Sequence, residues 1–345
     1  MSERATAKTE FDFDPAALRR WLASNQPNLT GKMDLERVGG GQSNPTYFVT
    51  IGSTRMVLRK RPVGELPKSA HDVGREYRIL SALQNEAPPT PRPIAFCDTD
   101  EVIGTPFYLM ERVEGRIFHD AALPEAPKAE RRAYYREFAR TLAALHAVDW
   151  RAGGMAELAR PGRFLERQVD RWERAWTGTT ATDPNVSRVA DWLRRNMPDT
   201  DHLGIVHGDY KFTNVIFDPI RPRLAAVLDW ELCAIGDPMA DVAHCWSALW
   251  QTGPDEYGGV MGLDLDGFGL PTAEAFFADY YEAANDGRRM TSFYLALAHF
   301  RNAGIFHGIR QRAEAGTANA ADAAHTGRLD RVYLERAFAV TEGAA

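Results

Sequence analysis

The chain has 345 residues, 44% of them hydrophobic and 26% charged, and a formal net charge of −6. This composition is ordinary for a soluble globular protein, and the length suggests about two domains or lobes. The acidic balance argues against a general binder of nucleic acid or of membrane surfaces, so we expect neither as a partner.

Cysteine usage and hydropathy indicate the compartment. The three cysteines, Cys97, Cys233 and Cys245, are scattered and lack the spacing of metal ligands, which is typical of a reducing environment. No segment reaches the ~18 apolar residues of a membrane span, and residues 1–10 lack the apolar core of a signal peptide. We therefore expect a cytoplasmic protein.

The N-terminal third is predicted to be rich in β-structure after one short helix. Asp14 suits the N-cap of that helix and Pro15 its first position, and the helix is expected to serve packing. Strand-like runs follow at residues 35–38, 46–51 and 56–59, and a helix with one apolar stripe is predicted for residues 70–83.

A glycine-rich turn joins the first two of these strand-like runs. It consists of Gly39, Gly40, Gly41, Gln42, Ser43 and Asn44. Without Cβ atoms, the backbone N–H groups of such a turn can approach phosphates closely. The pattern is not G-x-G-x-x-G, so an ordinary flexible hairpin remains an alternative.

The boundary between two lobes is predicted near residue 113. A proline-rich segment at residues 88–93 cannot be helical and leads into a strand at 94–97, and residues 107–115 form a strand that ends in a polar segment. The expected domains are a helical extension at residues 1–30, a small β-rich lobe at 31–113 and a larger helical lobe at 114–345.

Helices dominate the predicted C-terminal lobe. They are expected at residues 126–147, 164–176, around 189–193, and at 273–284, 289–313 and 320–340. Residues 251–271 are rich in glycine and aspartate and are predicted to be a mobile loop. Arg301, His307 and Arg310 fit a solvated helix face better than a cleft for an acidic acceptor.

The chemistry is concentrated in residues 205–217. Apolar residues flank a polar turn there, and a second apolar run at 224–228 predicts a hairpin that brings Asn214 beside Asp229, with Asp209 at its mouth. Two carboxylates and a carboxamide supply oxygen ligands for Mg²⁺ and a proton acceptor for a hydroxyl nucleophile. The alternative is that these side chains only make turn hydrogen bonds.

The spacing His-x-Asp-x-x-x-x-Asn, followed by Leu-Asp-Trp, is similar to the catalytic loop and the metal-binding Asp of protein kinases. More closely, the segments 207–209, 228–231 and 236–238 resemble the aminoglycoside phosphotransferase/choline kinase-like family. Within that family they resemble the branch that includes the kinase domains fused to some acyl-CoA dehydrogenases. The resemblance extends from about residue 38 to beyond residue 310.

This resemblance implies an α+β, protein-kinase-like two-lobed fold, with a small antiparallel-sheet N-lobe and a larger helical C-lobe. It implies ATP- and Mg²⁺-dependent phosphorylation of a hydroxyl group on a small molecule. Asp209 is expected to orient the acceptor hydroxyl and accept its proton, and Asn214 and Asp229 are expected to hold Mg²⁺. His207 is expected to buttress the loop. Lys211 is expected either to stabilise the transferring phosphoryl group or to be an ordinary surface lysine.

The resemblance also implies the nucleotide-binding residues of the N-lobe. Arg59 stands where many kinases carry a phosphate-contacting lysine, and Glu76 is the acid expected to pair with it. The hinge that binds adenine is expected to include Met110, Glu111 and Val113. The glycine-rich turn at residues 39–44 is expected to cover the phosphates.

Two other functions remain open at this stage. A non-catalytic nucleotide-binding module is supported by the arginine at position 59, and a protein kinase shares the catalytic-loop pattern. The absence of a long phosphosite-bearing segment after Asp229 favours a small-molecule kinase. The fold does not fix the acceptor. The resemblance to dehydrogenase-fused domains favours a hydroxyacyl compound or another metabolic alcohol, and the sequence leaves the oligomeric state open.

Overall fold

The computed structural model describes residues 11–39, 44–63, 72–84, 86, 88–176, 183–199, 202–316 and 323–343. The chain divides into two compact units. Unit 1 comprises Met1–Gln84 and Pro91–Val113, and unit 2 comprises Asn85–Thr90 and Glu114–Ala345.

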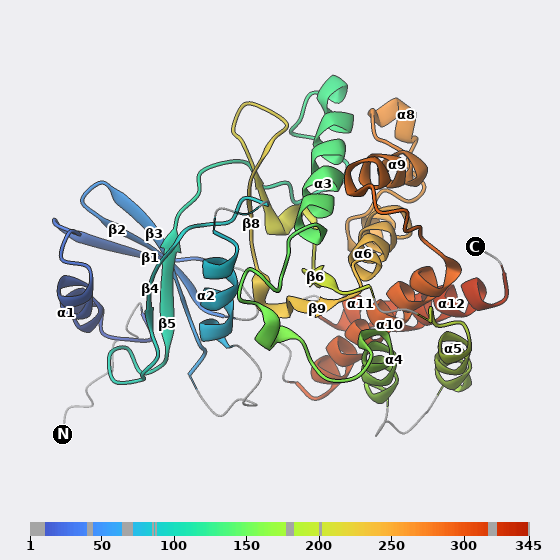
Figure 1. The fold of residues 1–345 in the computed structure, drawn as a ribbon, viewed down its shortest axis with the longest axis horizontal. Coiled ribbons are helices and arrows are strands. Elements are labelled where there is room, and N and C mark those ends of the chain that lie inside the picture. The colour runs from blue at the N-terminus through green and yellow to red at the C-terminus, as the bar shows by residue number, and fades with distance from the viewer. Residues whose placement is uncertain are drawn as a thin grey trace, which may run out of the picture. The chain divides into compact units, whose positions relative to one another are not determined.

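Unit 1 is built on a five-stranded antiparallel sheet with the strand order β1-β2-β3-β5-β4 (Figure 1). Its strands are β1 (Met33–Arg37), β2 (Thr46–Ile51), β3 (Thr54–Lys60), β4 (Pro93–Cys97) and β5 (Phe107–Glu111), and its helices are α1 (Pro15–Asn25) and α2 (Val73–Ala82). Alternate residues of β2 are buried, as the pleat of a half-covered strand requires.

The helix α1 is part of the core of unit 1. Asp14 accepts a hydrogen bond from the backbone N–H of Ala16 and Pro15 occupies the first turn, so the helix begins where its cap predicts. Leu18 and Leu22 are fully buried in a cluster that includes alternate residues of β2 and β3. The other helix, α2, is capped in the same way by Asp72.

Unit 2 is mainly helical and contains two small antiparallel sheets (Figure 1). Its helices are α3 (Arg131–His146), α4 (Phe164–Arg174), α5 (Pro184–Arg195), α6 (Met239–Trp250), α7 (Pro254–Tyr257), α8 (Leu265–Phe268), α9 (Ala273–Ala284), α10 (Ser292–Glu314), α11 (Ala323–Gly327) and α12 (Leu329–Thr341). The sheets pair β6 (Gly204–Val206) with β9 (Ala234–Gly236), and β7 (Val215–Phe217) with β8 (Leu224–Val227). Short 3₁₀ turns occur at Lys128–Glu130, Ala156–Leu158, Phe212–Asn214 and Trp230–Leu232.

The long helix α10 is the centre of unit 2. It packs against α4, α5, α6, α11 and α12, and its buried residues lie on more than one face. This packing explains why α10 lacks a simple apolar stripe, because a helix covered on several sides is apolar around most of its circumference.

An aromatic stack supports the loop between β6 and β7. The ring of Phe138 on α3 stacks against Tyr210, with 4.3 Å between centroids, and against Phe212, at 4.6 Å. The Tyr210 hydroxyl also donates to the Phe138 carbonyl at 3.0 Å. The side chains of Tyr210 and Phe212 therefore anchor the loop in the apolar core of unit 2.

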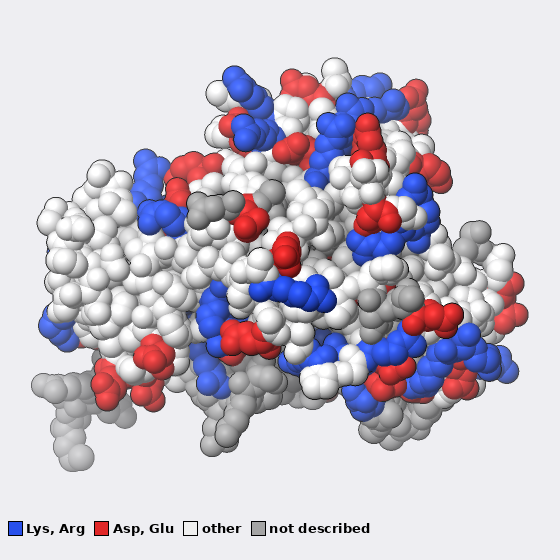
Figure 2. Space-filling view, viewed as in Figure 1, with Lys and Arg blue, Asp and Glu red and all other residues white. Residues whose placement is uncertain are grey.

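The surface of unit 2 mixes both signs of charge, as Figure 2 shows on one face. Successive turns of α3 form ion pairs with acids of α8 and α9: Arg132 with Asp266, Arg136 with Asp279 and Arg140 with Glu282. Exposed pairs of this kind contribute little free energy each, typically ~0–1 kcal/mol. They nevertheless account for most of the basic residues of α3.

The predicted α+β, kinase-like architecture is confirmed, and two local predictions are wrong. Residues 251–271 are not simply a loop, because they contain α7 and α8 and are anchored by the Arg336–Glu256 ion pair and by Trp250, which donates to the Pro271 carbonyl. The predicted helix at 320–340 is divided at Arg328 into α11 and α12. Among the described residues, no helix is long and apolar enough to cross a membrane.

Candidate active site

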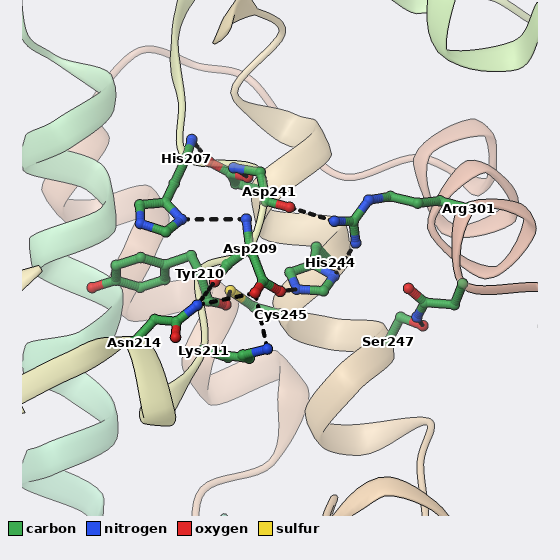
Figure 3. A network of polar contacts seen from close by, with 12 residues as sticks. His207, Asp209, Tyr210, Lys211, Asn214, Asp241, His244, Cys245, Ser247 and Arg301 are labelled. Atoms are coloured by element: carbon green, nitrogen blue, oxygen red, sulfur yellow. Dashed lines mark hydrogen bonds and ion pairs between the residues drawn. The ribbon is translucent and has the colours of Figure 1, made fainter. Parts of the chain in front are cut away.

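The entry to the loop between β6 and β7 is fixed by one buried carboxylate. Asp241 on α6 accepts hydrogen bonds from the backbone N–H groups of His207, at 2.6 Å, and Gly208, at 2.9 Å (Figure 3). Gly208 has a φ of 85°, and a Cβ there would lie 2.8 Å from the carbonyl oxygen of Leu232. The glycine between His207 and Asp209 is therefore required by the turn itself.

The imidazole of His207 joins this loop to the segment before Asp229. Its Nδ1 accepts from the backbone N–H of Asp209 at 3.2 Å, and its Nε2 lies 2.8 Å from the Leu228 carbonyl. Because a backbone N–H can only donate, Nδ1 is unprotonated and Nε2–H donates to Leu228. His207 is fully buried, so its contacts are structural.

The carboxylate of Asp209 is contacted from three sides. Its Oδ2 lies 2.9 Å from the ammonium of Lys211 and accepts from the side-chain amide of Asn214 at 3.0 Å. Its Oδ1 lies 3.4 Å from Nε2 of His244. The Asp209 side chain remains 23% exposed, so a solute can still reach this oxygen-rich group.

The surrounding charges keep Asp209 ionised. Burial raises its pKa, but the contact with His244 and the positive charges of Lys211 and Arg301 outweigh burial and hold the pKa well below its usual value. Conversely, burial lowers the pKa of Lys211, but its contact with Asp209 more than compensates and raises it. The two groups therefore form an ion pair at neutral pH, which holds the ammonium of Lys211 against the carboxylate of Asp209.

The β7–β8 hairpin places Asn214 next to the residue before Asp229. Val215 is paired with Val227, and the backbone N–H of Leu228 donates to the Asn214 carbonyl at 2.8 Å. Asp229 has φ 62° and ψ 65°, a left-handed conformation that is uncommon outside glycine and often marks functional positions. The predicted hairpin is confirmed.

The donor set of this hairpin fits Mg²⁺ bound together with a nucleotide. Asn214 uses its amide nitrogen to donate to both the carbonyl and the carboxylate of Asp209, so its side-chain oxygen is the atom that can serve a metal. Within the described part of the chain, no group of three or more His, Cys, Asp or Glu residues forms a metal cage. Mg²⁺ typically binds one or two carboxylates and completes its shell with waters and phosphates. Asn214 and Asp229 match that pattern.

In unit 1, the predicted pair of Arg59 and Glu76 is present. Nε of Arg59 lies 3.3 Å from Oε2 of Glu76, and the two side chains are only 12% and 2% exposed. Glu76 also accepts from the side-chain amide of Asn44 at 2.7 Å and from the Tyr108 hydroxyl at 2.9 Å. A buried carboxylate with these partners is satisfied, and it fixes the direction of the arginine.

The other predicted nucleotide-binding residues lie in the glycine-rich turn and at the end of β5. Residues 40–43 of the glycine-rich turn lie outside the described residues, whereas its ends, Gly39 and Asn44, are described. Met110 is buried on β5, and Glu111 is exposed at the end of that strand, where its backbone N–H donates to the Arg92 carbonyl. Val113 is partly buried just beyond the strand.

Sequence reasoning missed His244 and misplaced Arg301. Arg301 does not belong to a solvated helix face, because its two terminal nitrogens bond to Nδ1 of His244 and to the carbonyl of Gly208. His307 and Arg310 are likewise directed inward, and both contact Asp330. His244 lies one helical turn after Asp241, and this spacing was the only signal that could have placed it at the loop.

Comparisons with known proteins agree with this geometry. The model of the phosphotransferase enzyme family matches residues 34–290, which is most of the chain. The chain belongs to this family. It is 37% identical over 323 residues to acyl-CoA dehydrogenase family member 10 of Mus musculus, covering 91% of this chain but only 30% of that protein. The chain thus spans about a third of the length of that relative.

Solved structures of phosphotransferases share the fold. The crystal structure of a Ralstonia eutropha protein assigned as an aminoglycoside phosphotransferase has a TM-score of 0.86, with 36% identity and coverage of 96% of this chain and 99% of that one. A ternary complex of the aminoglycoside phosphotransferase APH(4)-Ia with AMP-PNP and hygromycin B has a TM-score of 0.59 at 16% identity, covering 93% and 98% of the two chains. At that identity, the second likeness concerns the fold alone.

Proposed function

We propose that this phosphotransferase family member transfers the γ-phosphoryl group of ATP to a hydroxyl group of a small molecule, with Mg²⁺ as cofactor. The observation that carries the proposal is the arrangement around Asp209, an ionised and solvent-accessible carboxylate beside Lys211 and Asn214. Phosphoryl transfer depends on positioning and charge neutralisation, and these groups supply both.

In this proposal, Asp209 orients the acceptor hydroxyl and receives its proton as the new O–P bond forms and the bond from the γ-phosphorus to the bridging oxygen breaks, which releases ADP. Lys211 balances the charge of Asp209 and faces the negative charge of the phosphoryl group. Asn214 and Asp229 would hold Mg²⁺, which would supply positive charge beside the ATP phosphates. His207 keeps the loop in register with Leu228, so that the base and the metal ligands stay together.

Nucleotide binding by unit 1 relies on a rigid cation. Arg59, held by Glu76, is proposed to contact the ATP phosphates, because a guanidinium can donate two parallel hydrogen bonds to phosphate oxygens. Residues 39–44 are proposed to cover the phosphates, and the backbone of Glu111 and Val113, with the side chain of Met110, is proposed to receive adenine. The AMP-PNP complex of the APH(4)-Ia neighbour is consistent with a nucleotide site in this fold.

The acceptor is proposed to be a hydroxyacyl compound or another metabolic alcohol with a negative charge. Cations gather near Asp209: Lys211 and Arg301 both lower its pKa. The guanidinium groups of Arg171 on α4 and of Arg301 both lie over the ring of Trp172, at 4.6 and 5.9 Å from its centroid. Such surroundings attract a carboxylate or phosphate and repel a polycationic aminoglycoside.

A measurement of ADP release tests this proposal. Purified protein with ATP and Mg²⁺ is offered anionic hydroxy acids and hydroxyacyl thioesters, neutral or choline-like alcohols, and aminoglycosides, and the phosphorylated product is identified by mass. We expect turnover with an anionic alcohol. Transfer of labelled phosphate to proteins in a mixture would indicate a protein kinase instead. ATP binding without ADP release from any compound, and without slow hydrolysis by water, would indicate a non-catalytic nucleotide-binding module.

A further inference from the structure

His244 lies between Asp209 and Arg301, which come from segments far apart in the sequence. His244 is on α6, and Arg301 reaches it from α10 (Figure 3). The guanidinium of Arg301 contacts Nδ1 of His244 at 2.7 Å and also donates to the carbonyl of Gly208. On the opposite edge of the imidazole, Nε2 faces Oδ1 of Asp209 at 3.4 Å.

The contact with Arg301 determines where the imidazole carries its proton. A guanidinium has five N–H donors and no acceptor, so the ring nitrogen that it contacts must be the unprotonated one. Nδ1 of His244 is therefore the acceptor, and Nε2 carries the hydrogen. The neutral ring consequently presents its only N–H to the carboxylate of Asp209.

The surroundings of His244 keep the ring neutral. Asp209 faces it from the loop, Arg301 from α10, and Asp241 lies one turn earlier on α6. Burial lowers the pKa of His244, and so does the charge of Arg301, and together they outweigh the two carboxylates. A second proton on the ring would have to displace the guanidinium from Nδ1.

We propose that His244, held by Arg301 as the Nε2–H tautomer, is a positioning residue that orients Oδ1 of Asp209 toward the acceptor hydroxyl. This inference rests on the proposed function. Lys211 and Asn214 both contact Oδ2 of Asp209, whereas His244 faces Oδ1. His244 can therefore limit rotation of the carboxylate from its other oxygen. The separation of 3.4 Å between Nε2 and Oδ1 is long for a hydrogen bond, and catalytic hydrogen bonds often tighten only when the substrates bind.

The same geometry prevents His244 from acting as the base. Its Nδ1 is occupied by Arg301, and its Nε2 already carries a hydrogen, so neither nitrogen can take a proton from Asp209. Toward Asp209, His244 can donate a hydrogen bond but cannot accept a proton. Substitutions should therefore affect how well Asp209 is aligned and should leave the identity of the base unchanged.

Kinetics of matched variants test the positioning role. His244→Leu removes the N–H and should lower kcat by about 10- to 100-fold, the range in which misplacement of a catalytic group costs rate. The KM for ATP should change by less than about twofold, because His244 is assigned to the acceptor side of the site through Asp209. His244→Gln can place an amide N–H near the position of Nε2 and should recover most of the lost turnover.

A second buried histidine serves as the control. His299 on α10 is also buried, but it contacts Ser247 and not Asp209. His299→Leu should lower the unfolding temperature without the loss of kcat that His244→Leu causes. If both substitutions lower kcat equally, or if the Gln variant is as slow as the Leu variant, the positioning role is wrong.

The tautomer can be measured without any acceptor. In long-range ¹H–¹⁵N spectra of the wild type, the signals lost in His244→Gln should show a neutral ring with the hydrogen on Nε2. Arg301→Met should allow the Nδ1–H form to appear. A charged ring or an Nδ1–H tautomer in the wild type would overturn the inference. No ADP release by the wild type would overturn the proposed function, whereas wild-type turnover that His244→Leu leaves unchanged would overturn this inference alone.

Discussion

Arg59 and Lys60 are neighbours on β3, but they form ion pairs on opposite faces of the sheet. Arg59 contacts Glu76 of α2, and the ammonium of Lys60 lies 2.7 Å from the carboxylate of Asp12. This separation follows from the pleat of a strand, in which successive side chains point to opposite sides. Lys60 is fully buried, and Tyr47 donates to the same aspartate at 2.5 Å. Lys60 therefore holds the N-terminal segment in place, and Arg59 is the residue of this pair that we propose to contact phosphate.

The first prediction concerns the Arg59–Glu76 pair. Arg59→Ala should weaken ATP binding by ~1.5–3 kcal/mol, the usual value of a charge-assisted contact. Glu76→Ala should cause part of the same loss, because Glu76 directs the guanidinium. The two losses should not add in the double variant. Isothermal titration with ATP provides all four affinities, and full additivity would show that the residues act independently.

Lys60 is the matched control for this cycle. Lys60→Met removes a neighbouring charge of the same sign and leaves Asp12 without its ammonium partner. It should lower the stability of the protein in denaturant titrations and leave ATP affinity close to that of the wild type. The opposite outcome, a loss of ATP affinity with unchanged stability, would show that Lys60 and not Arg59 serves the phosphates.

The second prediction concerns the metal ligands. Asp229→Asn removes a charge, and asparagine tolerates the left-handed backbone at this position better than most residues. Mg²⁺ should tighten ATP binding in the wild type and should do so much less in this variant. Calorimetry with Mg²⁺ or with EDTA measures the gain, and Asp98→Asn, an exposed acid of unit 1, controls for the change in net charge. An equal gain in Asp229→Asn and the wild type would remove Asp229 from the metal site.

The third prediction concerns pH. Burial lowers the pKa of His299 from 6.5 to about 3, assisted by the charge of Arg336. Between these two pH values the unfolded chain binds a proton that the folded protein excludes, so stability falls as the pH falls from 6.5 toward 3. The slope is at most ~1.4 kcal/mol per pH unit for one group. His299→Gln, which can still bond to Ser247, should remove this part of the slope in denaturant titrations at pH 4–7, and an unchanged slope would contradict the assignment.

The sequence predicted well those features that depend on local pattern. The helix α9 was predicted with the observed ends, because Thr272 caps its start and Asn285 ends it in a left-handed conformation. The β7–β8 hairpin followed from two apolar runs around a turn. The pairing of Arg59 with Glu76 was available only through the resemblance to kinases, since no local pattern links a strand residue with a helix residue.

Contacts between distant helices could not be predicted in this way. His244 and Arg301 are 57 residues apart, and their contact exists because α10 packs against α6. From the sequence alone, an arginine on a helix is most simply assigned to solvent. The two arginines of α10 also differ in their contacts: Arg301 supports the loop, whereas Arg310 contacts Asp330 of α12. This difference likewise appears only in three dimensions.

The last prediction concerns Asp209. Its proposed role as the base must be separated from a structural role like that of the neighbouring carboxylate of Asp241. Asp209→Asn keeps the shape of the side chain and removes the base, so turnover should fall by ~10²–10⁴-fold, the usual contribution of a general base. ATP affinity in the presence of Mg²⁺ should change by less than ~1 kcal/mol, because this side chain is assigned to the acceptor. Slow hydrolysis of ATP by water supplies a readout before the acceptor is known.

Asp241→Asn is the comparison: Asp241 is buried and accepts from two backbone N–H groups, so its substitution should reduce the stability of the loop and of the fold. A fully stable Asp209→Asn protein that keeps wild-type turnover would exclude Asp209 as the base, and loss of activity only in parallel with unfolding would assign it a structural role like that of Asp241.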